Sequence, residues 1–184
     1  MTAEKLNELR NELSIKSKNG IDFTLAASLI WLIIAFLWTL EFRAYDRSIF
    51  VFIASGLLLP MAFLFSKILK TIWKITNNPL QPLGLWLNFA QLFYFPFLIF
   101  IMIKSSEYFI MVYAIITGAH LFPYGWFYKT NWYPILSGII AVGALLFGLH
   151  LSFEKMYLVA IFTSVSLLIL TSLLYFDSAK KGKQ

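Results

Sequence analysis

The sequence predicts an all-α protein, a polytopic bundle of about six helices that cross a membrane, preceded by a short amphipathic helix. The chain has 184 residues, of which 60% are apolar and 18% aromatic, whereas only 13% are charged, against about 25% in soluble domains. The apolar residues form repeated runs, each about as long as the roughly 20 residues that cross a bilayer. No linker between the runs is long or polar enough to separate two domains. These observations exclude a water-soluble fold.

Residues 1–20 are expected to form a cytoplasmic arm. Leu6, Leu9 and Leu13 recur at i, i+3 and i+7, whereas three glutamates occupy another face, a pattern typical of an amphipathic helix. An Asn-Gly pair follows and can end the helix. We expect the arm to lie along the inner headgroups or across the cytoplasmic ends of the bundle. Binding of a partner protein is the alternative.

Six uncharged apolar runs follow the arm and are the expected spans. They cover residues 21–40, 48–66, 83–103, 107–126, 133–151 and 155–175. We expect one transmembrane domain over residues 21–176 and a basic cytoplasmic tail over residues 177–184. No small-residue cleavage site closes the first run, so we expect it to be retained rather than removed as a signal peptide. An even number of spans places both termini on one side.

The basic residues predict which side that is, because short cytoplasmic loops retain Lys and Arg. If both termini are cytoplasmic, eleven of the fifteen basic residues lie on that side. The eleven are Lys5, Arg10, Lys16, Lys18, Lys67, Lys70, Lys74, Lys129, Lys180, Lys181 and Lys183. We therefore predict a multi-pass protein of the cell membrane with both termini in the cytoplasm. The net charge of +6 then faces anionic lipid of the inner leaflet, the expected partner, and nucleic acid is not expected.

Polar groups within the spans carry most of the information about function, because hydrocarbon cannot satisfy them. The fourth run places four of them on one helical face at i, i+4, i+7 and i+11, the third run adds two at i and i+3, and the first run adds a serine. Most fall in the cytoplasmic half, where we expect a polar pocket; hydrogen bonding between helices is the alternative. The expected ligand-binding residues are Ser28, Asn88, Gln91, Tyr113, Thr117, His120, Tyr124 and Trp126.

Two further patterns concern helix packing. Pro60, Pro96 and Pro123 lie in the second, third and fourth runs, where each removes an N–H and frees a carbonyl; a packing kink is the expected result, and a carbonyl-lined cavity is the alternative. The fifth run presents a face of small residues at i, i+4, i+7 and i+11, from Ser137 to Gly148. This face allows close helix approach, either within the bundle or in a homodimer.

No pattern indicates catalysis, a metal or another cofactor. The chain has no cysteine, and its two histidines, His120 and His150, lie at different depths of the predicted membrane. No HExxH motif, GxSxG elbow or glycine-rich phosphate loop is present, so neither a zinc protease nor a serine hydrolase nor a nucleotide-binding protein is indicated.

The stretch from His120 to Tyr128 reads H-x-x-P-Y-x-W-x-Y, and an Asn-Pro turn at Asn78 and Pro79 precedes the aromatic third run. In these features the chain resembles an uncharacterised family of small bacterial multi-pass membrane proteins. The resemblance covers most of the chain. It implies no activity, cofactor or catalytic residue.

We therefore expect a non-enzymatic membrane protein that binds or transports a small amphiphilic or lipid-like molecule through the pocket. His120 would be its hydrogen-bonding or titrating group, oriented by Asn88 and Gln91. The alternative is an accessory or regulatory subunit that acts by contact with a partner membrane protein. An intramembrane enzyme with His120 as a base is a weaker alternative, because no nucleophile, metal set or second acid accompanies this residue.

Overall fold

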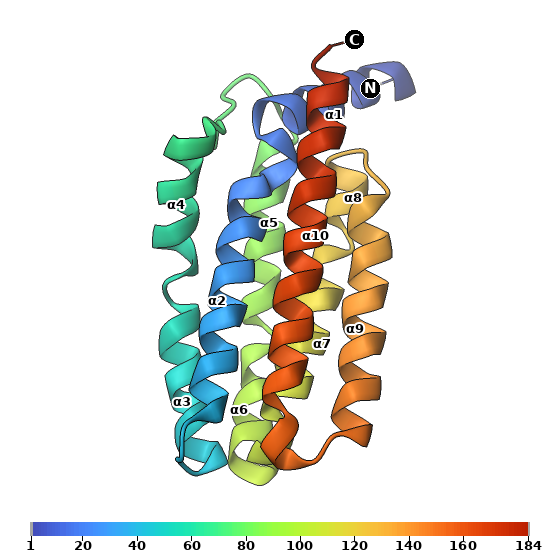
Figure 1. The fold of residues 1–184 in the computed structure, drawn as a ribbon. Coiled ribbons are helices and arrows are strands. Elements are labelled where there is room, and N and C mark those ends of the chain that lie inside the picture. The colour runs from blue at the N-terminus through green and yellow to red at the C-terminus, as the bar shows by residue number, and fades with distance from the viewer. Residues whose placement is uncertain (1, 184) are drawn as a thin grey trace.

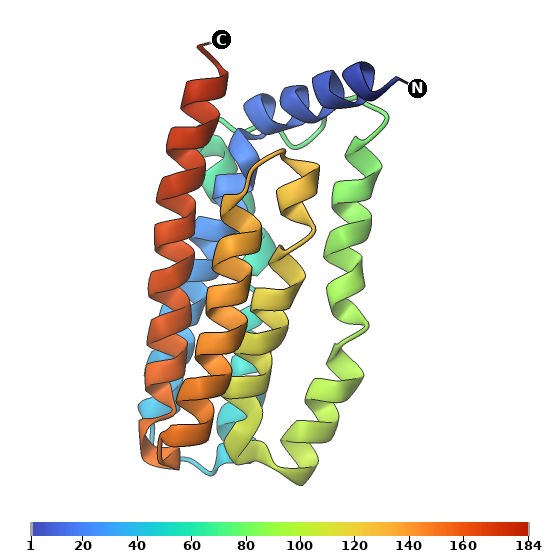
Figure 2. The ribbon, with the colours of Figure 1, turned by 90° about the vertical axis from the view of Figure 1, so that its right-hand side faces the viewer.

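Within residues 2–183, which the computed structural model describes, the chain is helical and contains no strand (Figure 1). Six helical stretches of 19 to 29 residues are long and apolar enough to cross a membrane, so the predicted fold class is confirmed. They run up and down one bundle (Figure 1, Figure 2). Three of the stretches begin with a short 3-10 turn, at Lys18, Ser106 and Phe153. Their α-helices are α2 (Ile21–Thr39), α3 (Ala44–Ser55) with α4 (Leu58–Leu69), α5 (Gln81–Leu92) with α6 (Phe95–Lys104), α7 (Phe109–Leu121) with α8 (Tyr124–Phe127), α9 (Trp132–His150), and α10 (Tyr157–Lys181).

The N-terminal helix α1 (Ala3–Lys16) lies across one end of the bundle, at which the C-terminal end of α10 also lies (Figure 2). We call this the terminal end, and the opposite one the far end. Leu9 and Leu13 of α1 are buried against the bundle, which explains the leucine spacing in the sequence. The arm is therefore docked on the helix ends in this structure.

A left-handed elbow joins α1 to α2. Lys18, Asn19 and Gly20 have successive φ values of 47°, 57° and 73°, a region that side chains with a Cβ adopt at a cost. The elbow is held by its own side chain, since Asn19 donates to the carbonyl of Leu174 at 3.1 Å. A Cβ at Gly20 would lie 3.1 Å from the hydroxyl of Tyr128. Both backbone conformation and space thus require glycine there.

Helix α2 packs most extensively against α10. The hydroxyl of Ser28 donates to the carbonyl of Ser164 at 2.9 Å, and the hydroxyl of Ser164 donates to the carbonyl of Ser28 at 2.7 Å. One turn away, Thr171 donates to the hydroxyl of Thr24 at 2.8 Å. Small hydroxyl residues therefore let these two helices approach closely, which is how many membrane helices associate.

The small-residue face of α9 packs against α7. A Cβ at Gly118 of α7 would lie 2.8 Å from the backbone nitrogen of Ala141, and Ser137 donates to the carbonyl of Gly118. Gly148 meets Met111 in the same way. We expected this face either to pack within the bundle or to form a homodimer, and in the structure it packs within the bundle. A homodimer would need another surface.

Three of the six stretches break where the prolines lie. The break between α5 and α6 falls at Phe93 and Tyr94, whose N–H groups donate to carbonyls three residues earlier at 3.2 and 3.1 Å, and Pro96 follows. Between α7 and α8, Phe122 donates to the carbonyl of Ala119 at 3.2 Å. That carbonyl, freed by Pro123, is therefore paired locally rather than exposed to a cavity, and the break is a packing kink.

The third stretch lies at the edge of the molecule. Figure 2 shows α5 and α6 beside α7 and α8, on the side away from α10. Only 6% of its most apolar segment is buried, against 56% for the fourth stretch. Helix α5 contacts α8 through Gly84, where a Cβ would lie 3.0 Å from the Phe127 ring. The third stretch is therefore the least buried of the six.

Candidate functional site

Ser28 does not join the predicted pocket. Its hydroxyl bonds to Ser164 in the interface between α2 and α10, away from α5. The expectation that polar groups of the first, third and fourth spans meet is therefore wrong for the first span. The physical reason is that the last span, not the third, is the neighbour of α2, and its hydroxyls satisfy those of α2.

Tyr113 and Thr117 lie deep in the bundle. The Tyr113 hydroxyl donates to Ser55 at 2.9 Å, and its ring lies 5.1 Å from that of Trp31. Thr117 donates to the carbonyl of Tyr113 at 2.9 Å, within its own helix. Both polar groups are therefore satisfied inside the protein.

His120 and Tyr124 are the predicted residues that the structure brings into contact. Their ring centroids are 5.5 Å apart, edge to face. Tyr124 is 7% exposed and its ring also contacts those of Phe127, Tyr128 and Tyr133. Among the described residues, the Tyr124 hydroxyl has no hydrogen-bond partner although it is buried. His120 is half-buried beside it.

Asn88 and Gln91 lie on α5, both half-buried. Asn88 donates to the carbonyl of Gly84 at 3.0 Å within its own helix. The contact between Gly84 and Phe127 shows at which depth of the bundle Asn88 and Gln91 lie. Helices α5 and α7 run in opposite directions, and Gln91 is seven residues from Gly84, just as His120 is seven residues from Phe127. At about 1.5 Å per residue, Gln91 lies near the depth of His120, and Asn88 near that of Tyr124.

Trp126 belongs to another part of the molecule. Its exposed ring lies under the guanidinium of Arg10, 4.7 Å from the ring centroid, and Arg10 Nε donates to the carbonyl of Trp126 at 2.6 Å. The residue therefore attaches the arm to α8 at the terminal end. As an interface aromatic it matches its sequence pattern, and its position is outside the contact of His120 with Tyr124.

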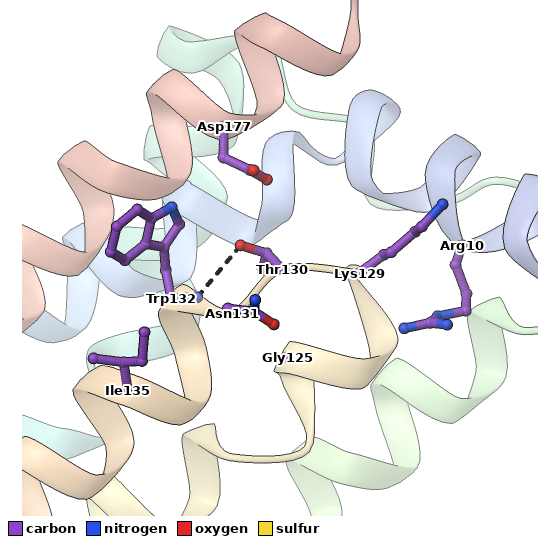
Figure 3. A pocket seen from close by; sticks show the side chains of 8 residues that line it. All are labelled: Arg10, Gly125, Lys129, Thr130, Asn131, Trp132, Ile135 and Asp177. Carbon is purple, nitrogen blue, oxygen red and sulfur yellow. Dashed lines mark hydrogen bonds between the residues drawn. The ribbon is translucent and has the colours of Figure 1, made fainter.

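A hollow of about 550 Å³ lies at the terminal end (Figure 3), and the sequence did not indicate it. Charged and polar residues line it: Arg10, Lys129, Thr130, Asn131 and Asp177. Gly125, Trp132 and Ile135 complete the lining. Figure 3 shows Arg10 reaching from α1 toward the turn between α8 and α9, and Lys129 reaching from that turn toward α1. In the sequence, only Lys129, an isolated basic residue between Tyr128 and Trp132, pointed to this hollow. The second basic residue, Arg10, comes from the distant arm.

The comparisons with known proteins give a family. Residues 6–177 match the model of a family described as "Family of unknown function (DUF7010)". The chain belongs to this family. The match includes all six membrane-length stretches except the last residues of α10. No curated protein and no solved structure matches the chain. The expected resemblance to an uncharacterised family is thus confirmed at this level, while the motif at residues 120–128 as its mark stays a prediction.

The charges in and beside the hollow of this DUF7010 chain fall into a paired and an unpaired set. Lys181 Nζ contacts Asp177 at 2.6 Å and donates to Ser14 and to the carbonyls of Tyr128 and Lys129 at 2.9 to 3.1 Å. Asp177 also accepts from Asn19 at 2.9 Å. Its charge is therefore neutralised within the protein.

Arg10 and Lys129 form the unpaired set, since over residues 2–183 the ion pairs include neither of them. Burial lowers the pKa of the Arg10 guanidinium from its ordinary value, because no acid offsets the lost solvation. An arginine nevertheless stays charged at neutral pH. The hollow thus carries two cationic side chains without a counter-charge.

The described residues hold no group of three or more His, Asp or Glu that could bind a metal ion. The binding roles predicted for His120 and its neighbours stay predictions. The groups of the arrangement are a phenol, an imidazole and amides, each of which can donate or accept a hydrogen bond.

Proposed function

We propose that this chain is a non-enzymatic membrane protein that binds a small amphiphilic molecule at the edge of the bundle, between α5 and α7. The observation that carries the proposal is the buried, unpartnered hydroxyl of Tyr124 beside His120. The polar group of the amphiphile would bond to this hydroxyl. Its apolar part would lie along the exposed aromatic side chains of α5 and α6.

The energetic argument concerns the unpaired hydroxyl. A buried polar group without a partner costs about 1–3 kcal/mol, and nearly all such groups in proteins are paired with protein or ordered water. A ligand oxygen at this point would recover that free energy. Asn88, Gln91 and His120 are half-buried and lie near the depth of Tyr124 or one turn from it. They supply further donors and acceptors, so a ligand with more than one polar atom fits better than a hydrocarbon.

The loose packing of α5 supports lateral entry. A lipid-like molecule dissolves in the bilayer and reaches a protein from the side, so its route needs a helix that separates easily. The third stretch is the least buried of the six, and Gly84 lies close to the Phe127 ring of α8. We further propose that the terminal end faces the cytoplasm, because eleven of fifteen basic residues gather on it.

Retention of lipid by the purified full-length chain tests the proposal. Tyr124→Phe removes one oxygen and no hydrogen bond within the protein. We expect native mass spectrometry to show a bound amphiphile on the wild type, with its occupancy reduced about tenfold or more in Tyr124→Phe, the loss of one hydrogen bond of about 1.4 kcal/mol.

Tyr175→Phe is the matched control, because Tyr175 is 50% exposed on α10 and its variant loses the same atom away from the site. We expect the control to retain the amphiphile as the wild type does. Equal occupancy in wild type, Tyr124→Phe and His120→Ala would overturn the proposal.

Contact with another membrane protein is a second candidate function. One observation favours it: the outward side of α5 and α6 exposes Trp86, Phe93 and Phe97, and Phe93 is 84% exposed. Aromatic side chains are enriched at protein interfaces. Crosslinking in cells from a photoreactive residue at Phe93 would then recover one dominant protein. Recovery of lipid adducts alone would rule this candidate out.

A further inference from the structure

We propose that the hollow at the terminal end is a second binding site, which takes a phosphate monoester through Arg10 and Lys129. The two side chains come from elements far apart in the sequence, α1 and the turn between α8 and α9, and reach into the same space (Figure 3). The site is separate from the contact of His120 with Tyr124, so it does not depend on the function proposed above.

The sign of the charge selects an anion. Of the three charged residues in the lining, Asp177 is neutralised by Lys181 at 2.6 Å, whereas Arg10 and Lys129 have no acidic partner within the part of the chain that the structure describes. Helix α9 begins at Trp132 on the rim, so the positive end of its dipole adds to the same preference.

The donors select phosphate over a carboxylate. Arg10 Nε and Nη1 already donate to the carbonyl of Trp126 and to Asn7, which leaves the Nη2 donors of its guanidinium for a ligand. The ammonium of Lys129 presents three more donors, and together they suit the several oxygens of a phosphate. The hydroxyl of Thr130 and the amide of Asn131 also line the space. A volume of about 550 Å³ is larger than a carboxylate needs, and it leaves room for the rest of an ester.

The wall of the hollow that α9 forms indicates where the esterified group would lie. Trp132 is 37% exposed and Ile135 is 48% exposed, and both line the hollow on the side of α9. An apolar substituent could follow this face into the bilayer, and a polar one could leave through the open side. The same phosphate chemistry could thus come from a lipid headgroup or from a soluble phosphate ester, and the experiment separates the two.

Thermal unfolding of the full-length chain in a neutral detergent provides the test. The probes are inorganic phosphate at matched ionic strength, short-chain phosphatidic acid, and short-chain phosphatidylcholine. We expect phosphatidic acid or inorganic phosphate to raise the unfolding temperature of the wild type more than phosphatidylcholine does. Arg10→Gln with Lys129→Gln should weaken that binding about tenfold or more. A response to phosphatidic acid alone identifies a lipid source, and an equal response to inorganic phosphate identifies a soluble one.

Lys67→Gln with Lys183→Gln is the matched control, since it removes two positive charges from the same end of the molecule outside the hollow. The control should bind within about twofold of the wild type, because screened surface charges at a distance contribute little. If the double variant in the hollow does not fold, Lys129→Gln alone is measured in its place. The Lys129 ammonium makes no hydrogen bond within the part of the chain that the structure describes, so this substitution should not disturb folding. No response of the wild type to either phosphate probe, or equal losses in variant and control, would overturn the proposal.

Discussion

Tyr113 and Tyr124 differ in the hydrogen bonding of their hydroxyl groups. Both are buried on the fourth stretch, but the Tyr113 hydroxyl is bonded to Ser55 at 2.9 Å, whereas that of Tyr124 has no partner among the residues described. Spacing in the sequence places the two on one helical face. It does not reveal which hydroxyl a neighbouring helix satisfies.

The two tyrosines give opposite predictions for stability. Tyr113→Phe leaves the Ser55 hydroxyl without its donor, so the free energy of unfolding should fall by about 1 kcal/mol. Tyr124→Phe removes an unsatisfied group, so the delipidated protein should be as stable as the wild type or more so. Denaturant unfolding in mixed micelles measures both. A loss in Tyr124→Phe equal to that in Tyr113→Phe would mean that the Tyr124 hydroxyl is paired.

Ser28 yields a prediction that separates packing from binding. Ser28→Ala removes a hydrogen bond to α10 and should cost about 0.6 kcal/mol, the average for such bonds between membrane helices. Ser164→Ala should cost about as much, and the double variant should cost less than the two added, because the residues bond to each other. Lipid retention should stay unchanged in all three. Loss of bound lipid in Ser28→Ala would instead return this residue to the binding site.

At the scale of elements, the apolar runs predicted the helices well and their ends less well. Helix α10 continues to Lys181, past the expected end of the apolar span at residue 175, because the i,i+4 pair of Asp177 with Lys181 at 2.6 Å stabilises its last turn. Helix α3 starts at Ala44, where Arg43 pairs with Asp46. Charged residues end an apolar run without ending the helix.

Neighbouring helices could not be predicted from the runs. The polar face of the fourth span and the small-residue face of the fifth span were visible in the sequence, but not which faces meet. The last span satisfies Ser28, and the arm supplies Arg10 to a hollow formed by the turn at Lys129. Both contacts join residues more than a hundred positions apart, and periodicity carries no information at that range.

Docking of α1 should depend on pH through Glu12. This carboxylate bonds to Lys16 at 2.6 Å and to Asn78 of the loop that joins α4 to α5 at 2.8 Å. These two hydrogen bonds lower the pKa of Glu12 below its ordinary 4.5. A carboxyl whose pKa is lowered by folding stabilises the folded state above its ordinary pKa, and this stabilisation is lost as the pH falls through the lowered value.

We therefore expect Glu12→Gln to increase the hydrogen exchange of α1 at pH 7 and to make no difference well below pH 4.5. Glu8→Gln is the control, because Glu8 pairs with Lys5 of its own helix at 2.9 Å and does not contact the bundle. Equal effects of the two substitutions at neutral pH would show that the bond to Asn78 does not hold the arm.

At the scale of the whole molecule, the distribution of charge predicts an orientation. Since the chain has no cysteine, single cysteines can report sidedness without background labelling. An impermeant maleimide should label Glu154→Cys, at the far end, in intact cells, and Lys183→Cys only after permeabilisation. The reverse pattern would place the basic terminal end outside and contradict the positive-inside argument.

The most direct measurement for the proposed function is photocrosslinking from position 91. A benzophenone side chain in place of Gln91, which lies on α5 level with His120, should form an adduct of one defined mass. Tyr124→Phe in the same chain should reduce the yield of this adduct about tenfold or more. A benzophenone at Leu85, which is 58% exposed, reports bulk lipid. Adducts at position 91 that match the mixture at Leu85 and persist in Tyr124→Phe would contradict a specific amphiphile site between α5 and α7.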